Sequence, residues 1–417
     1  MRRFSLFVIV ASLGFLAGCG GSGSSTPKGV PPGGGSGANV QAIAVDGGPQ
    51  AGVIYPNGAF TSVTICNPGT TTCQAIDGIL VDTGSFGLRI LSSAITLTGL
   101  QVLTSGNSTL YNCINFADGS FLWGTAAVAD VQMASELASS ATIQVIADPT
   151  GFSIPTNCSN GGIDEDNLAA LGANGILGIG PEPVDCGLAC DPSGGNQFPP
   201  EPFYYLCSSG TTCAPQFVTL AQQVVNPVVL FSTDNNGTII ELPALSGAGA
   251  TASGSMIFGI GTQTNNQIPS TASVFTLDSL DTFSATYKGV TYNSSTNPPT
   301  PSFIDLGSNA LFLPDSTIPL CTDVASFYCP TSLQSLSATV QGTTSGETGS
   351  VSFAVDNADN LFATSGGADA AFSTLGGPNV GGGVDFGLPF FYGKTVFTSI
   401  DGQAVPSGAP AAPWWAF

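Results

Sequence analysis

The sequence predicts a mostly β protein with few short helices, arranged as two related β lobes. Three observations support this prediction. The 29 prolines and 55 glycines are scattered along the chain, and the short runs rich in Val, Ile, Phe and Thr between them are typical of antiparallel strands joined by turns. The chain has 417 residues, which is more than one hydrophobic core usually supports. Finally, one patterned segment occurs twice.

The expected strands are short apolar runs bounded by turn residues. They are residues 61–66, 78–82, 126–133, 141–147, 228–232, 255–259 and 394–399. Helical patterns are scarce, and residues 215–225 are the best helix candidate. The fold class therefore rests on β structure.

The repeated segment has the pattern apolar-Asp-x-Gly-Ser-x-x-Leu-x-(Ile/Leu). Its copies are residues 81–91 and 304–314. A second shared element follows each copy, Gly-Ile-Leu-Gly at 175–178 and Val-Asp-Phe-Gly at 384–387. Two elements in the same order indicate duplication of a whole lobe. We expect an N-terminal β lobe at 40–247 and a C-terminal β lobe at 248–417.

The N-terminus has the features of an export signal. Arg2 and Arg3 precede an apolar stretch, which ends in Leu-Ala-Gly-Cys at 16–19. This ending resembles a bacterial lipobox, which implies a lipoprotein signal peptide at 1–18 and an acylated Cys19; a plain signal peptide is the alternative. Residues 19–39, rich in Gly, Ser and Pro, would then tether the protein to the outer membrane.

The cysteine count also favours export. Setting Cys19 aside from the 11 cysteines leaves an even number, which fits five disulfides in an oxidising compartment. The simplest connectivity joins near neighbours, although spacing does not fix it: Cys66 with Cys73, Cys186 with Cys190, Cys207 with Cys213, Cys321 with Cys329, and Cys113 with Cys158. Zinc is the rival explanation, but the chain has no histidine and no Cys-x-x-Cys pair. We expect no metal.

The charge balance excludes nucleic acid as a partner. The chain has 6 basic and 27 acidic residues, so almost nothing could neutralise phosphates. After the leader no apolar run is long enough to span a bilayer, which leaves the lipid as the membrane contact. The remaining partner we expect is a peptide or protein substrate, bound by a monomer.

An apolar strand that runs into Asp-x-Gly-Ser places a carboxylate at the strand end, where the glycine permits a tight turn and hydroxyl and N–H groups can hold the acid. One such segment is as often an Asx turn as a catalytic loop. Two copies related by a twofold axis would bring Asp82 and Asp305 together. Two adjacent carboxyls share a proton, and such a pair can hydrolyse an amide by general acid and base catalysis.

The ordered segments resemble the pepsin-like aspartic peptidases from about residue 39 to about residue 401. The matching segments are 79–91 and 303–308 for the two active-site loops, 175–178 for an N-lobe strand, 217–232 for a closing helix and strand, 254–259 for an interlobe strand, and 387–397 for the last strand pair. The resemblance implies a bilobal fold with an interlobe cleft and no cofactor. It assigns catalysis to Asp82 and Asp305, loop support to Thr83, Gly84, Ser85, Leu306, Gly307 and Ser308, and the flap to Phe116, Asp118 and Gly119.

Three departures from the family pattern affect the expected activity. Leu306 stands where the family has a hydroxyl that completes a reciprocal grip between the loops. Phe116 stands where the family has a flap tyrosine, and Asp118 adds a charge near the flap tip. We therefore expect an aspartic endopeptidase, with a catalytically inactive lipoprotein that binds a peptide, glycan or envelope protein as the alternative. An unrelated β-sandwich lipoprotein would require the repeat to be accidental.

Other segments have simpler interpretations. The acidic runs at 164–166 and 356–360 lack the spacing of a calcium loop, so we expect solvated turns. The terminal residues 414–417, Trp-Trp-Ala-Phe, are expected to pack against the β structure; a surface binding patch is the alternative.

Overall fold

The structure, a computed structural model, describes residues 37–116, 118–147, 152–194, 198–199, 201–208, 212–322, 324–344, 346–379 and 382–417. The leader, Cys19 and most of the tether lie outside these residues. The predictions about them stay predictions.

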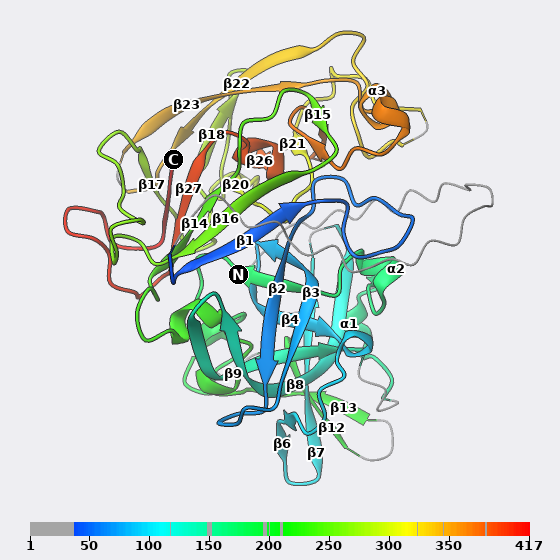
Figure 1. The fold of residues 1–417 in the computed structure, drawn as a ribbon, viewed down its shortest axis with the longest axis vertical. Coiled ribbons are helices and arrows are strands. Elements are labelled where there is room, and N and C mark those ends of the chain that lie inside the picture. Colours follow the sequence, from blue (N-terminus) through cyan, green and yellow to red (C-terminus); the bar gives the residue numbers. More distant parts are fainter. Residues whose placement is uncertain are drawn as a thin grey trace.

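The described part of the chain is mostly β structure, as predicted (Figure 1). One hydrogen-bonded network holds 18 strands: β1 (Val40–Val45), β2 (Ala59–Cys66), β3 (Cys73–Asp82), β4 (Phe86–Leu91), β5 (Gln101–Val102), β6 (Thr104–Ser105), β7 (Ser108–Asn115), β8 (Ser120–Met133), β9 (Glu136–Ile146), β10 (Ile163–Asp164), β11 (Gly175–Ile179), β12 (Tyr204–Ser208), β13 (Thr212–Pro215), β14 (Gly237–Glu241), β16 (Ala252–Phe258), β17 (Val274–Thr276), β27 (Thr395–Ser399) and β28 (Trp414–Ala416).

Three smaller sheets come from the second half of the chain. They pair β15 (Ala248–Gly249) with β24 (Ala371–Phe372), join β18 (Ser284–Tyr287), β19 (Val290–Tyr292), β22 (Gln334–Gln341) and β23 (Thr348–Val355), and join β20 (Phe303–Ile304), β21 (Leu311–Leu313), β25 (Gly376–Pro378) and β26 (Asp385–Phe386). The α-helices of the described residues are short: α1 (Thr156–Ser159), α2 (Leu168–Leu171) and α3 (Ala358–Ala363). None of them has the length to cross a bilayer.

Two groups of strands repeat one connectivity. In the first, β3 runs parallel to β11, β11 is antiparallel to β4, and β4 is parallel to β9. In the second, β20 is parallel to β26, β26 is antiparallel to β21, and β21 is parallel to β25. The sequence repeat therefore corresponds to a repeated strand pattern, with β3 ending at Asp82 and β20 ending one residue before Asp305.

Segments far apart in sequence are joined close to these strands. In Figure 1, β1 crosses the middle of the molecule, where it pairs with both β2 and β16. Asn57 is fully buried with a positive φ of 53°. Its side-chain amide donates to the carbonyls of Asn309 (2.8 Å) and Phe372 (2.9 Å), and its Oδ1 accepts from the Phe372 N–H (2.7 Å). One amide thus ties the chain near β2 to two segments of the second half.

The expected helix over residues 215–225 is wrong, and so is the strand over 228–232. The structure has a 3₁₀ turn at Leu220–Gln222 and another at Pro227–Leu230. The first begins with a capping box between Thr219 and Gln222 and ends at once in extended backbone. The second begins with Pro227, which suits a first turn, and Asn226 caps it through the Val228 N–H. Local capping therefore outweighs the weak periodic patterns. The other expected strands lie within β2, β3, β8, β9, β16 and β27 or differ from them by one residue.

All five expected disulfides are present in the predicted pairs: Cys66–Cys73, Cys113–Cys158, Cys186–Cys190, Cys207–Cys213 and Cys321–Cys329. The Cys113–Cys158 bridge closes the longest loop, with a sequence separation of 45, and fastens α1 to β7. Asp359 lies near Cys321 and Cys329, but these two sulfurs are bonded to each other and offer no thiolate ligand. The expected packing of Trp414 and Trp415 is also confirmed, because both rings are buried and β28 pairs with β17 and β27.

Candidate active site

Asp82 and Asp305 lie against each other. Asp82 is 1% exposed and Asp305 is 0% exposed. A Cβ atom on Gly84 would lie 2.7 Å from the carboxyl carbon of Asp305, and one on Gly307 would lie 2.6 Å from Oδ1 of Asp82. Each carboxyl therefore packs over the glycine of the other turn, and only glycine leaves room for this approach.

Each turn holds its aspartate in the same way. The Gly84 N–H donates to Asp82 Oδ1 at 2.7 Å, and the Ser85 hydroxyl donates to Asp82 Oδ2. In the second turn the Gly307 N–H donates to Asp305 Oδ1 at 2.8 Å, and the Ser308 hydroxyl lies 2.9 Å from Asp305 Oδ2. The sequence repeat thus produces two carboxyls with equivalent local donors.

One contact crosses between the turns. The Leu306 N–H donates to the Thr83 hydroxyl at 2.9 Å, over a separation of 223 residues. A matching hydrogen bond from the first turn to a hydroxyl of the second turn is not possible, because the second turn has Leu306 where the first has Thr83. The Leu306 side chain is instead fully buried in the main apolar cluster. Apolar packing of Leu306 therefore takes the place of a second hydrogen bond between the turns.

Burial raises the pKa of both carboxyls above the ordinary aspartate value. The pKa of Asp305 rises well above that value, first because of burial and then because of the charges of Asp82 and Asp385. Two carboxyls in contact and away from water cannot both ionise. The arrangement therefore favours one shared proton, which makes one member an acid and the other a base.

Phe116, Asp118 and Gly119 lie at the end of the hairpin formed by β7 and β8. The Phe116 N–H donates to the Ser120 carbonyl at 2.9 Å, and the Gly119 N–H donates to the Phe116 carbonyl at 3.1 Å. Phe116 is buried in an apolar cluster, whereas Asp118 is exposed and accepts from the Ser120 N–H and hydroxyl at 2.8 Å each. Ala117 lies outside the described residues.

A pocket adjoins the first turn. Its walls include Gly84, Ser85, Phe116, Phe203 and Asp281. These wall residues come from the first turn, from the β7–β8 hairpin, from the position just before β12 and from the loop between β17 and β18. Of the residues that the sequence singled out, Gly84, Ser85 and Phe116 line this pocket, whereas Asp82 and Asp305 are not among its lining residues.

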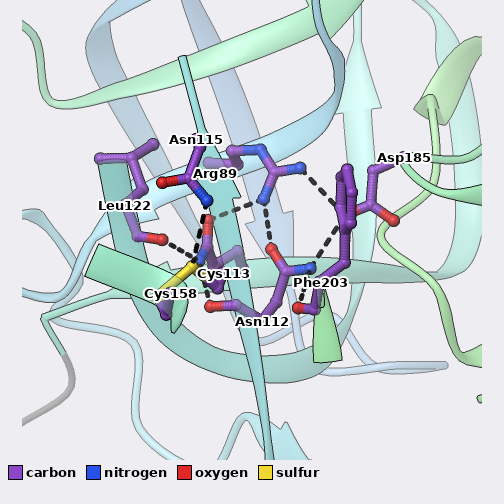
Figure 2. Close-up of a disulfide and its surroundings, with 9 residues drawn as sticks. Arg89, Asn112, Cys113, Asn115, Leu122, Cys158, Asp185 and Phe203 are labelled. Atoms are coloured by element: carbon purple, nitrogen blue, oxygen red, sulfur yellow. Dashed lines mark hydrogen bonds and ion pairs between the residues drawn. A yellow bond between two sulfur atoms is a disulfide. The ribbon is translucent and has the colours of Figure 1, made fainter. Parts of the chain in front are cut away.

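A buried ionic network that includes two residues of the pocket wall was not foreseen (Figure 2). Arg89 on β4 is fully buried, and its guanidinium donates to Asp185 (3.0 Å), Gln144 (2.7 Å) and Asn112. Figure 2 shows Asn112 reaching from Arg89 to Asp185, beside the Cys113–Cys158 bridge. Arg89 and Asp185 also line the pocket. The feature of the sequence that could have indicated this network is Arg89 itself, a charged residue inside the otherwise apolar strand β4.

A third carboxyl near the pair was also missed. Asp385 on β26 is 0% exposed, and its Oδ2 lies 2.7 Å from the Ser308 hydroxyl. Burial raises its pKa well above the ordinary value. Aligning the shared element that follows each copy, Gly-Ile-Leu-Gly with Val-Asp-Phe-Gly, would have placed this acid at the position of Ile176.

The solvated acidic turn expected at 164–166 is wrong for its central residue. Glu165 is 3% exposed, and its N–H donates to the Phe121 carbonyl at 3.1 Å, because β10 pairs with the start of β8. Burial, followed by the charge of Asp118, raises the pKa of Glu165 to about 8. In the other acidic run, Asn357 caps α3 by accepting from the Asn360 N–H at 3.0 Å.

The structure thus defines a mostly β protein with a buried carboxyl pair, built on a repeated strand pattern. A family model described as "Protein of unknown function (DUF3443)" matches residues 35–417, and the chain belongs to this family. No curated protein matches the chain.

Proposed function

We propose that this protein is a bilobal, pepsin-like aspartic endopeptidase that hydrolyses peptide bonds through Asp82 and Asp305. The observation that carries the proposal is the contact between two buried carboxyls, each held by its own Asp-x-Gly-Ser turn. The repeated strand connectivity and the hydrogen bond between Thr83 and the second turn support it. The chemistry needs no cofactor.

The reaction would use the single proton of the pair. The ionised carboxylate takes a proton from a water molecule whose oxygen attacks the peptide carbonyl carbon, while the neutral carboxyl protonates the carbonyl oxygen. When the tetrahedral intermediate breaks down, the carboxylate takes a hydroxyl proton back and the acid protonates the departing nitrogen. The pair returns to one proton, and the products are a carboxylic acid and an amine.

We further propose that the enzyme is a lipoprotein of the outer membrane, acylated at Cys19 and held away from the bilayer by the Gly-, Ser- and Pro-rich tether. Five disulfides support an oxidising compartment. Intact-mass analysis of detergent-extracted protein should show the lipid increment on Cys19. A form that begins at another residue and carries no lipid would contradict the anchor.

A catalytically inactive binding protein is the second candidate, and Leu306 is the observation that favours it. A buried leucine stands where a hydroxyl could complete the contact between the turns. Such a protein would keep the fold and bind a peptide, glycan or envelope protein without cleaving it.

Cleavage of a reduced and alkylated protein substrate between about pH 3 and pH 7, the range in which carboxyl pairs titrate, distinguishes the two. The full chain should cleave, and Asp82→Asn and Asp305→Asn should each abolish cleavage because an amide cannot share the proton. Asp401→Asn, at an exposed position, is the matched control. Cleavage that survives both substitutions would refute catalysis by Asp82 and Asp305. A wild-type chain that cleaves nothing would support the inactive binding protein.

A further inference from the structure

The two turns hold their aspartates with equivalent donors but in different surroundings. The Ser85 hydroxyl donates to Asp82. The Ser308 hydroxyl lies between two carboxyls, 2.9 Å from Asp305 Oδ2 and 2.7 Å from Asp385 Oδ2. A hydroxyl has one proton to donate, so Asp305 and Asp385 compete for it.

The fold does not require an acid at position 385. It pairs with Phe303 on β20 and with Phe312 on β21. In the first strand group the corresponding position of β11 holds Ile176, which is also 0% exposed. The same backbone position therefore accepts a buried aliphatic side chain in one group and a buried acid in the other.

In the described part of the chain, no cation is paired with this acid. The titratable groups that act on Asp385 are the carboxyls at the ends of β3 and β20, and its partners on β20 and β21 are phenylalanines. Neither the Arg89–Asp185 ion pair nor the Lys288–Asp315 ion pair includes it. Its Oδ1 is buried and has no hydrogen-bond partner in that part of the chain.

We propose that Asp385 is a positioning residue that makes Asp305 the acid and Asp82 the base of the pair. By competing for the Ser308 proton, and by its own charge when it ionises, it disfavours the ionised form of Asp305. The Ser85 hydroxyl donates to Asp82 without such a competitor, so Asp82 is the carboxyl that ionises. This inference rests on the proposed function for its role in catalysis, but the distribution of protons can be measured without it.

The test is a carbon-13 NMR titration of the full chain labelled at the aspartate carboxyl carbons, with resonances assigned through single Asp→Asn variants. In the wild type the Asp305 carbon should stay protonated to higher pH than the Asp82 carbon. Asp385→Ile, which copies Ile176, should lower the Asp305 transition by about one pH unit because Ser308 then donates to Asp305 alone. Asp385→Asn removes the charge but keeps an oxygen that can accept from Ser308, so it should lower the transition by less. Ser308→Ala should move it in the opposite direction. Asp401→Asn should leave it unchanged.

If the chain is active, the alkaline limb of its kcat profile should move down with the Asp305 transition in Asp385→Asn. If Asp305 titrates unchanged in both Asp385 variants, whether or not they lose stability, Asp385 does not set the distribution of the proton. Its role would then be packing alone. If the wild type cleaves nothing but the Asp305 transition still shifts, the peptidase proposal fails and the assignment of protons stands.

Discussion

Replacing Glu165 by glutamine should stabilise the protein at alkaline pH and have little effect at acid pH. Glu165 is buried beside the β7–β8 hairpin, and burial and the Asp118 charge raise its pKa from the ordinary 4.5 to about 8. A carboxyl whose pKa is higher in the folded than in the unfolded state contributes stability that is fully present below pH 4.5. That contribution is lost as the pH rises through 8.

The magnitude follows from the two pKa values. One pKa unit corresponds to about 1.4 kcal/mol, so the folded protein has lost about 5 kcal/mol through this residue above pH 8 and about 3 kcal/mol at pH 7. Glutamine has nearly the same shape and cannot ionise. The variant should therefore be more stable than the wild type by several kcal/mol at pH 8, and the difference should fall towards zero near pH 4.5.

The assay is urea unfolding of wild type and variant, with disulfides intact, at several values between about pH 4.5 and pH 8.5, the window set by the two pKa values. Other buried acids change with pH in both proteins, so the difference in unfolding free energy isolates Glu165. Glu347→Gln, at an exposed position just before β23, is the control for the loss of one charge. A stability difference that is the same at both ends of the range would refute the reasoning.

Three further predictions concern the surroundings of the pair. Removing the Cys113–Cys158 bridge with serines should lower the free energy of unfolding by about 2–5 kcal/mol, and urea midpoints that match the wild type would contradict this. Arg89→Met should lower the free energy of unfolding by about 3–5 kcal/mol because it leaves Asp185 buried without its cation. Adding Asp185→Asn should recover part of that loss. A double variant no more stable than Arg89→Met alone would argue against a stabilising ion pair between Arg89 and Asp185. Leu306→Thr, assayed by cleavage rate, should be tolerated or beneficial, since a new hydrogen bond contributes about 0.5–1.5 kcal/mol; a rate below one tenth of wild type would mean that apolar packing there is required.

Most strands and four of the five disulfides were predictable because their signals are local. Short apolar runs between glycines and prolines mark strands, and cysteines a few residues apart have few partners within reach. Cys113 and Cys158 are 45 residues apart and were expected to pair because they were the two cysteines left over. The positions of Asp82 and Asp305 followed from the repeat. The burial of Glu165 did not, because an acidic run reads as solvated until β10 is known to pair with the start of β8. The prediction of a helix at 215–225 was wrong for a local reason, because the capping interactions there favour a short 3₁₀ turn over the helix that the periodic pattern indicated.

The two strand groups agree in backbone and differ in charge at one paired position. On β11 and β4 the pair is Ile176 with Arg89, and on β26 and β21 it is Asp385 with Phe312. Each group therefore has one ionisable residue where the other is apolar, on opposite strands of the pair. The arginine is neutralised by its own network, so its effect on the site is mainly structural. The aspartate has no such partner and lies one hydroxyl away from Asp305. A pair with identical surroundings would have no preferred site for its proton, whereas this difference supplies one without any change to the backbone that brings the two carboxyls together.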